Sequence, residues 1–239
     1  YNSSDVNDNL KFETKDKSDA PKIPVIYIRK NAWLKNFANS LESIDLKLNI
    51  QYEELNRTAN NVIGYLDNKA PYTVIIGAHL DHLGLGQDGN SMLRNSEPAI
   101  HNGADDNASG TSGVLEVAQM VMSNKQAFKR SLLFMTFAGE ELGLLGSANF
   151  VSRPTVPLDK IEAMLNMDMI GRVANDRLFV GGVGTSPGFK PMLDDLNNGN
   201  GLNLTYSESG YGASDHTSFN AKKIPVLFFF SGLHTDYHK

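Results

Sequence analysis

The chain has 239 residues and no cysteine, and this absence narrows the chemistry that it can perform. Without thiols there can be no disulfide and no thiolate ligand for a metal. Any metal must therefore be held by histidine and carboxylate side chains. The cellular compartment stays open, because a domain of this size can be stable without disulfides.

Long apolar runs and an excess of positive charge are also lacking. No apolar stretch approaches the roughly 18–20 residues of a membrane span. Lys and Arg number 22 against 27 Asp and Glu, and the net charge of -5 argues against nucleic acid as the main partner. The first residue is Tyr1 and no signal peptide is in view, so we expect the natural product to begin upstream.

Apolar strand patterns alternate with amphipathic helix patterns along most of the chain. The nearly all-apolar, β-branched run at residues 72–78 is typical of a central parallel strand that is buried on both faces. Further strands are predicted at residues 23–28, 46–52, 61–66, 131–137, 162–167, 178–180, 202–206 and 224–230, and helices at residues 30–41, 109–122, 141–151, 187–196 and 214–221. This alternation predicts an α/β fold, a three-layer sandwich with a mixed, mostly parallel central sheet flanked by helices.

Two adjacent acids, Glu140 and Glu141, follow the predicted strand at residues 131–137. Carboxylates at the mouth of a buried strand are costly unless a cation or a proton meets them. A helix N-terminus also accommodates acids, and the stretch alone leaves that alternative open. The more specific interpretation is that one of the two glutamates binds a metal and the other acts as a general base.

Other candidate ligands also follow predicted strands. His79 comes directly after the strand at residues 72–78 and Asp81 follows it, which suits a metal ligand and a carboxylate that orients it. The loop NGADDNASG at residues 102–110 carries two adjacent acids, and Asp168 ends an apolar strand. For each position alone, a satisfied core histidine, a helix cap or a structural acid is the plain alternative.

The C-terminal third adds a tyrosine and two histidines. Tyr211 could supply a hydroxyl to a developing oxyanion, whereas Ser214 or Asp215 could simply cap a helix. The chain ends in LHTDYHK, and spacing alone does not choose between His234 and His238 as a last ligand.

The combined donor set contains only nitrogen and oxygen atoms. Such a set suits zinc, with cobalt or manganese as substitutes. Two such ions, about 3.5–4 Å apart, would acidify a water molecule and polarise a carbonyl group. A free glutamate would take the proton of the water and pass it to the leaving amine, so the predicted reaction is amide-bond hydrolysis.

Six motifs in this order resemble the di-zinc co-catalytic exopeptidases, a family that includes bacterial leucyl aminopeptidases, glutamate carboxypeptidase and the transferrin receptor ectodomain. The resemblance covers most of the chain, from residue 61 to residue 238. The motifs are GAHLD at residues 77–81, GADDNASG at 103–110, AGEELG at 138–143, NMDM at 166–169, SDH at 214–216 and YH at 237–238.

The resemblance implies two Zn²⁺ ions and a role for each matching residue. The implied metal ligands are His79 and Asp168 on one ion, Glu141 and His238 on the other, and Asp105 as the bridge between them. The implied catalytic residues are Glu140 as general base and acid, Asp81 as the residue that orients His79, and Tyr211 as the oxyanion-stabilising tyrosine. Family members commonly have a cis peptide bond after the bridging acid, which here would join Asp105 and Asp106.

The resemblance also suggests how the chain is divided. Residues 1–45 are expected to be an N-terminal segment, a remnant of a protease-associated domain. Residues 46–239 are expected to form the zinc peptidase catalytic domain, shortened at its C-terminus because the family pattern continues beyond Lys239. Bacterial relatives are usually exported, so a secreted or periplasmic location is expected.

The leading interpretation is an aminopeptidase that removes N-terminal residues from peptides. A glutaminyl cyclase-like acyltransferase would use the same fold with a single zinc ion. A carboxypeptidase would need a basic pocket for the terminal carboxylate, for which Arg172 is a candidate. A catalytically silent binding domain, like that of the transferrin receptor, would lack the working site, whereas this sequence keeps every implied ligand.

Overall fold

The computed structural model describes residues 22–23, 25–37, 45, 47–49, 56–93 and 98–239. The chain divides into two units, Tyr1–Asn56 and Arg57–Lys239. The predicted division at residue 45, with a zinc peptidase catalytic domain over residues 46–239, stays a prediction. A relation of the first unit to protease-associated domains stays a prediction.

The N-terminal unit contains helix α1 (Lys30–Asn36), which begins where a helix was predicted. The predicted helix residues 38–41 lie outside the described residues. Residues 25–28 were predicted as part of a strand, yet they pair with no other strand among the described residues. The same holds for residues 47–49, while most of the remaining predicted strand at 46–52 lies outside the described part of the chain. Alternating apolar residues favour a strand only where a neighbouring strand can accept its hydrogen bonds.

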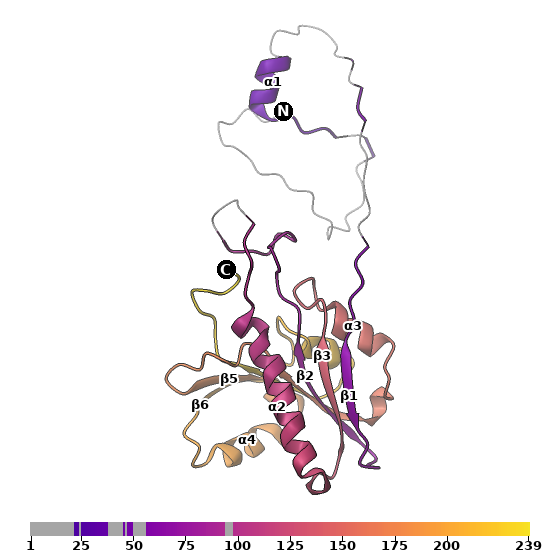
Figure 1. Cartoon of the computed structure of the whole chain (residues 1–239), viewed down its shortest axis with the longest axis vertical. Helices are drawn as coiled ribbons and strands as arrows, with labels where there is room; N and C mark the ends of the chain where they lie inside the picture. Colours follow the sequence, from indigo (N-terminus) through magenta and orange to yellow (C-terminus); the bar gives the residue numbers. More distant parts are fainter. Residues whose placement is uncertain (1–21, 24, 38–44, 46, 50–55, 94–97) are drawn as a thin grey trace. The chain divides into compact units, whose positions relative to one another are not determined.

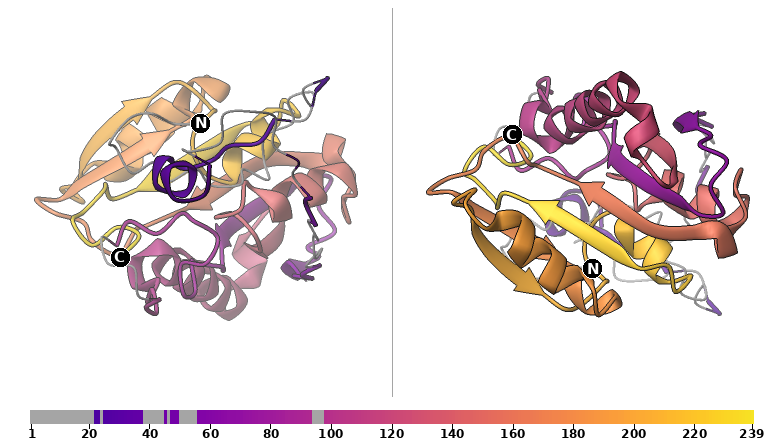
Figure 2. Two further views of the ribbon diagram at one scale, coloured as in Figure 1. Left: turned by 90° about the horizontal axis from the view of Figure 1, so that it is seen from above. Right: turned by 90° about the horizontal axis from the view of Figure 1, so that it is seen from below.

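The second unit is built on a seven-stranded sheet with the order β1-β3-β2-β4-β7-β5-β6, which Figures 1 and 2 show from three sides. The strands are β1 (Val62–Leu66), β2 (Thr73–His79), β3 (Ser131–Phe137), β4 (Ile161–Met167), β5 (Arg177–Gly181), β6 (Asn203–Ser207) and β7 (Val226–Phe230). Neighbours are parallel except for the pairs β1–β3 and β5–β7. The predicted mixed, mostly parallel sheet is therefore confirmed.

Two helices cover one face of this sheet. Val114 of α2 (Gly110–Ser123) packs with Ile76 of β2. Leu193 of α4 (Phe189–Asn197) packs with Val180 of β5. Leu165 of β4 touches both clusters, so α2 and α4 lie on the same face, as Figure 1 shows.

The opposite face is covered by α3 (Leu145–Ser152) and α5 (His216–Asn220), which completes the three layers. Phe150 of α3 and Phe219 of α5 pack together with their ring centroids 5.8 Å apart. Both rings join the largest buried cluster, with Phe137 and Met164 from the sheet. Burying each of these side chains stabilises the fold by about 1.5–3 kcal/mol.

The central strands bring the ends of three motifs to one edge of the sheet. His79 is the last residue of β2 and lies in register with Phe137, where β3 ends. Gly77 lies in register with Asn166 of β4, which places Asp168 beside the end of β2. Gly77 is required for this close packing, because a Cβ atom there would lie 2.7 Å from the Phe137 ring. Ligands of open α/β sheets gather at the carboxyl ends of strands, and this edge carries the predicted site.

No helix among the described residues is long and apolar enough to span a membrane.

Candidate metal centre

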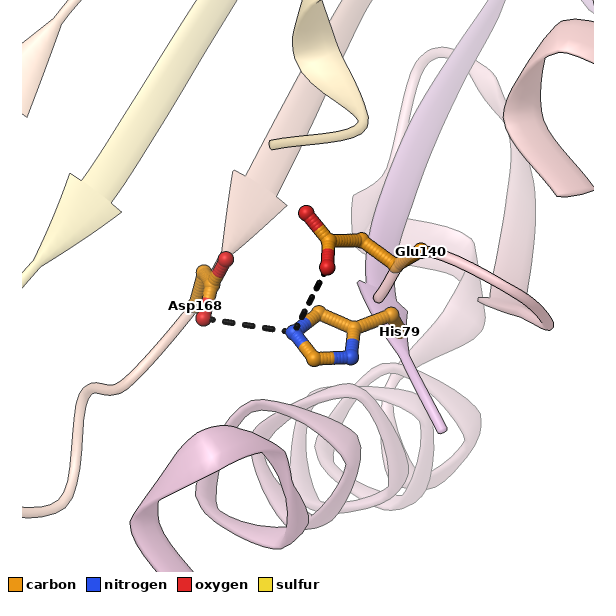
Figure 3. A group of neighbouring side chains, drawn as sticks. All are labelled: His79, Glu140 and Asp168. Atoms are coloured by element: carbon orange, nitrogen blue, oxygen red, sulfur yellow. Dashed lines mark ion pairs between the residues drawn. The ribbon is translucent and has the colours of Figure 1, made fainter. Parts of the chain in front are cut away.

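A first group of donor atoms surrounds His79, whose side chain is 1% exposed. Its Nε2 atom lies 3.2 Å from Asp106 Oδ1 and 3.4 Å from Asp168 Oδ1. Glu140 Oε2 is farther away, at 4.0 Å, and Figure 3 shows Glu140 and Asp168 directed at the same nitrogen of the His79 ring. Burial alone would lower the pKa of His79, but the carboxylates of Asp106, Asp168 and Glu140 raise it to about 12.

A second group is formed around His238, in the last turn of the chain. Its Nε2 atom lies 3.2 Å from Asp106 Oδ2 and 3.2 Å from Glu141 Oε2. The ring is stacked on Tyr237, with the centroids 3.8 Å apart. Asp106 therefore turns one carboxylate oxygen toward each group. Burial would raise the pKa of Asp106, yet the surrounding histidines, with His79 foremost, hold it below its usual value.

Asp105 does not occupy the position between the groups that the sequence led us to expect. Its Oδ1 atom accepts a hydrogen bond from the Gly171 amide at 2.8 Å, and its Oδ2 atom lies 3.1 Å from His234 Nε2. The cis peptide bond joins Asp106 and Asn107, and the predicted one between Asp105 and Asp106 is wrong by one residue. Adjacent side chains on a tight turn point in different directions. The sequence alone does not reveal whether Asp105 or Asp106 points toward the end of the sheet.

Asn107 holds this turn against the end of β4. Its Oδ1 atom accepts hydrogen bonds from the amides of Gly110 at 2.9 Å and Met169 at 3.1 Å. Its Nδ2 atom donates to the carbonyl of Met167 at 3.0 Å. The bonds with Met167 and Met169 connect the residues on either side of Asp168 to the turn that bears Asp106, so the two acids are positioned together.

Asp81 acts differently from the expectation that its carboxylate orients His79. The Nδ1 atom of His79 lies 3.0 Å from the backbone oxygen of Asp81 and 3.9 Å from its Oδ1 atom. The carboxylate instead accepts hydrogen bonds from the amides of Glu140 at 3.0 Å and Glu141 at 3.2 Å. Asp81 thus orients the histidine through its backbone and fixes the two glutamates through its side chain.

The two glutamates lie on an irregular turn, and α3 begins only at Leu145, later than the predicted start at residue 141. Gly139, Gly143 and Leu144 all have positive φ angles there, which a regular helix excludes. The irregular backbone lets the neighbouring side chains diverge. Glu141 faces His238, while Glu140 faces His79.

Burial gives Glu140 unusual acid–base properties. It raises the pKa of this carboxyl to about 9; His79 counteracts the shift, and the negative charge of Asp168 adds to it. A carboxyl group with a raised pKa takes up and releases protons near neutral pH more readily than an ordinary glutamate.

Tyr211 is the predicted site residue that the structure leaves apart from these groups. It lies in the loop between β6 and α5, and its side chain is 63% exposed.

Arg172 was considered as a free cation that could bind the terminal carboxylate of a carboxypeptidase substrate. The Arg172 guanidinium instead donates to Asp236 at 2.7 Å.

His82 is a functional candidate to which the sequence reasoning gave no role. Its Nδ1 atom lies 2.7 Å from Glu141 Oε1. The only signal in the sequence was a second imidazole three residues after His79, which spacing alone does not interpret. Two cavities, of about 860 Å³ and about 510 Å³, flank the site, and His82 contributes to the lining of both.

The donor spacing fits zinc. Tetrahedral Zn²⁺ binds nitrogen and oxygen at about 2.0–2.2 Å, which places neighbouring donor atoms about 3.3–3.6 Å apart. The distances from His79 and His238 to Asp106, Asp168 and Glu141 are 3.2–3.4 Å, close to this spacing. The 4.0 Å from His79 to Glu140 is longer, and the 2.7 Å from His82 to Glu141 is that of a direct hydrogen bond.

An α/β sheet that gathers histidine and carboxylate donors near the carboxyl ends of its strands defines a protein with a site suited to zinc. Residues 61–239 match peptidase family M28, and the chain belongs to this family. The predicted resemblance is thereby confirmed.

The named relatives are a probable leucine aminopeptidase, a leupeptin-inactivating enzyme and a zinc aminopeptidase. A probable leucine aminopeptidase of Arthroderma otae is 30% identical over 177 residues, which cover 70% of this chain and 45% of the relative. Leupeptin-inactivating enzyme 1 of Streptomyces exfoliatus is 33% identical over 184 residues, covering 76% and 37%. The structure of BSAP, a zinc aminopeptidase from Bacillus subtilis, matches with a TM-score of 0.58 and 27% identity, over 75% of this chain and 43% of that one. The chain spans less than half the length of each of these relatives.

Proposed function

We propose that the protein is a metallo-exopeptidase that hydrolyses the N-terminal peptide bond of peptides with two zinc ions. The observation that carries the proposal is the pair of donor groups joined by Asp106, at spacings suited to zinc. The names of the relatives support the aminopeptidase reaction and peptide substrates.

The five metal ligands follow from the two groups of donors. His79 and Asp168 would hold one ion, Glu141 and His238 would hold the other, and Asp106 would take the place between them that was predicted for Asp105. Bound zinc supplies Lewis acidity, which acidifies a water molecule and polarises the carbonyl of the scissile bond. His79 must lose its proton before it can bind a metal, so zinc uptake releases protons and is favoured at higher pH.

Glu140 moves the protons of the reaction. It lies beside His79 but beyond the spacing of the ligands, so its carboxylate remains free to act as a base. It takes a proton from the attacking water and gives it to the amine that leaves. Positive charge at the metal positions would counteract the effect of burial and bring its pKa down from about 9 toward the working range.

The other reactions on this fold have weaker support. A single-zinc acyltransferase would leave one of the two groups of donors without a role. A carboxypeptidase would need a free cation, whereas Arg172 is paired with Asp236. The oxyanion role of Tyr211, the side-chain preference and the secreted or periplasmic location stay predictions.

The proposal is tested by hydrolysis of leucine p-nitroanilide beside its N-acetylated form. Chelator-treated protein should be inactive, and added zinc should restore cleavage of the free-amine substrate alone. Zinc-dependent cleavage of both substrates would contradict the specificity for a free amino terminus. Bound zinc without cleavage of either substrate would contradict the aminopeptidase assignment.

A further inference from the structure

The carboxylate of Glu141 meets two imidazoles, one at each oxygen. Oε2 lies 3.2 Å from His238 Nε2, and Oε1 lies 2.7 Å from His82 Nδ1. Both histidines are well enclosed, with side chains 12% and 13% exposed. Their rings are nearly perpendicular, with centroids 5.8 Å apart. The ligand set described above uses only one of these imidazoles.

The two distances indicate different interactions. A separation of 3.2 Å matches two donors that share a zinc ion, whereas 2.7 Å is too short for such a pair and suits a charge-assisted hydrogen bond. His82 Nδ1 is also 3.8 Å from Asp106 Oδ2, which is too long for a shared tetrahedral ion. Because a carboxylate oxygen only accepts, the hydrogen of this bond must lie on Nδ1.

The backbone fixes the His82 ring in this place. Gly103 has a φ angle of 62° and precedes the turn that bears Asp106. A Cβ atom at Gly103 would lie 2.9 Å from the Cβ atom of His82. The ring is therefore packed between the second group of donors and the 103–106 turn.

We propose that His82 is a positioning residue for Glu141. It donates from Nδ1 to Oε1, which fixes the rotation of the carboxylate and leaves Oε2 to bind the metal beside His238. With Oε1 occupied, Glu141 binds through one oxygen only, so a coordination position stays open for water or substrate. The inference rests on the proposed function, because it concerns the ligand of the second zinc ion.

The first test measures zinc affinity by competition with a chelator in His82→Ala and His82→Asn. Partners that hydrogen-bond to a ligand typically change metal affinity by about 10–100-fold. We expect His82→Ala to weaken one of the two zinc ions by that factor and to leave the other unchanged. Asparagine places an amide N–H near the position of Nδ1, so His82→Asn should stay within about threefold of wild type.

His101 provides a matched control. Its ring centroid lies 6.3 Å from that of His82, and its Nε2 atom pairs with the Ser91 hydroxyl at 2.7 Å. His101→Ala removes a neighbouring imidazole that contacts no proposed ligand, and both zinc affinities should persist. Unchanged affinity in His82→Ala would overturn the proposal. An equal loss in His82→Asn and His82→Ala would also overturn it, because the amide N–H would then fail to replace the donation from Nδ1.

A second test does not depend on the number of zinc ions. Long-range ¹H–¹⁵N NMR spectra of metal-free protein, with the signals assigned through His82→Asn, report which ring nitrogen carries hydrogen. We expect a hydrogen on Nδ1 of His82, and a bare Nδ1 would overturn the proposal. If wild-type protein binds one zinc ion while Nδ1 carries its hydrogen, the two-zinc function fails and the hydrogen bond to Glu141 stands.

Discussion

Replacing Asp106 by asparagine should abolish the stabilisation of the protein by zinc. Asp106 is the one carboxylate that offers an oxygen to both His79 and His238, so its loss removes one of three protein donors from each group. A ligand present at 100 times its Kd stabilises the folded state by about 2.7 kcal/mol per site. Two sites give about 5 kcal/mol, which corresponds to a rise in Tm of about 10–20 °C for a domain of this size.

The assay compares the Tm of each protein with and without zinc, so that effects of the substitution on the metal-free protein cancel. Wild type should show the full shift and Asp106→Asn almost none. Asp105→Asn is the control, because its remaining oxygen can still accept the hydrogen bond from Gly171. A full zinc shift in Asp106→Asn would refute the role of Asp106, and loss of the shift in Asp105→Asn alone would make Asp105 the bridging acid.

Three further predictions follow from the site and its supports. Glu140→Gln should keep the zinc content, measured by metal analysis, and lower kcat by about 10²–10⁴-fold because it removes the proton carrier; near-normal turnover would contradict that role. Gly110→Ala should lower the unfolding free energy, measured by urea titration, by about 1–3 kcal/mol through overpacking. The added Cβ would lie 2.4 Å from Asn107 Oδ1. Gly188→Ala is the control, because its Cβ would meet nothing within 4 Å and the protein should tolerate it. Burial raises the pKa of Asp215 to about 7, so the folded state binds the extra proton and stability falls as pH rises from about 4 toward 7. In metal-free protein, Asp215→Asn should remove up to about 4 kcal/mol of this pH-dependent fall in the unfolding free energy. If the unfolding free energies of the variant and wild type change in parallel between pH 5 and pH 8, the raised pKa of Asp215 is refuted.

The sheet was predictable because its central strands are buried on both faces. The prediction for residues 131–137 matches β3 residue for residue, and β1, β2, β4 and β7 begin or end within about two residues of their predicted bounds. These runs have a continuous apolar composition, and only the interior of a parallel sheet can bury it. The run at residues 23–28 is short, and the pattern at residues 46–52 alternates instead of being continuously apolar; their described residues have no strand partner among the described part of the chain.

The turns were predicted less well. Helix α3 begins four residues after its predicted start, because Gly139 to Leu144 follow a path with three positive φ angles. The sequence marked this stretch as glycine-rich but did not define its route. The hydrogen bonds from the amides of Glu140 and Glu141 to Asp81 exist only when β2 and β3 lie side by side.

The sequence by itself determined the donor types of the proposed site: a cysteine-free set of histidines and acids, most of them at or just after the ends of strands. Only the tertiary structure decided which member of each neighbouring pair takes part. Asp106 and His238 face the shared position, while Asp105 and His234 pair with each other on the side of Arg172. The same holds for His82, whose contact with Glu141 joins residues 59 positions apart. Sequence spacing fixes the order of side chains along the backbone, whereas their directions depend on dihedral angles that packing sets after the sheet is formed.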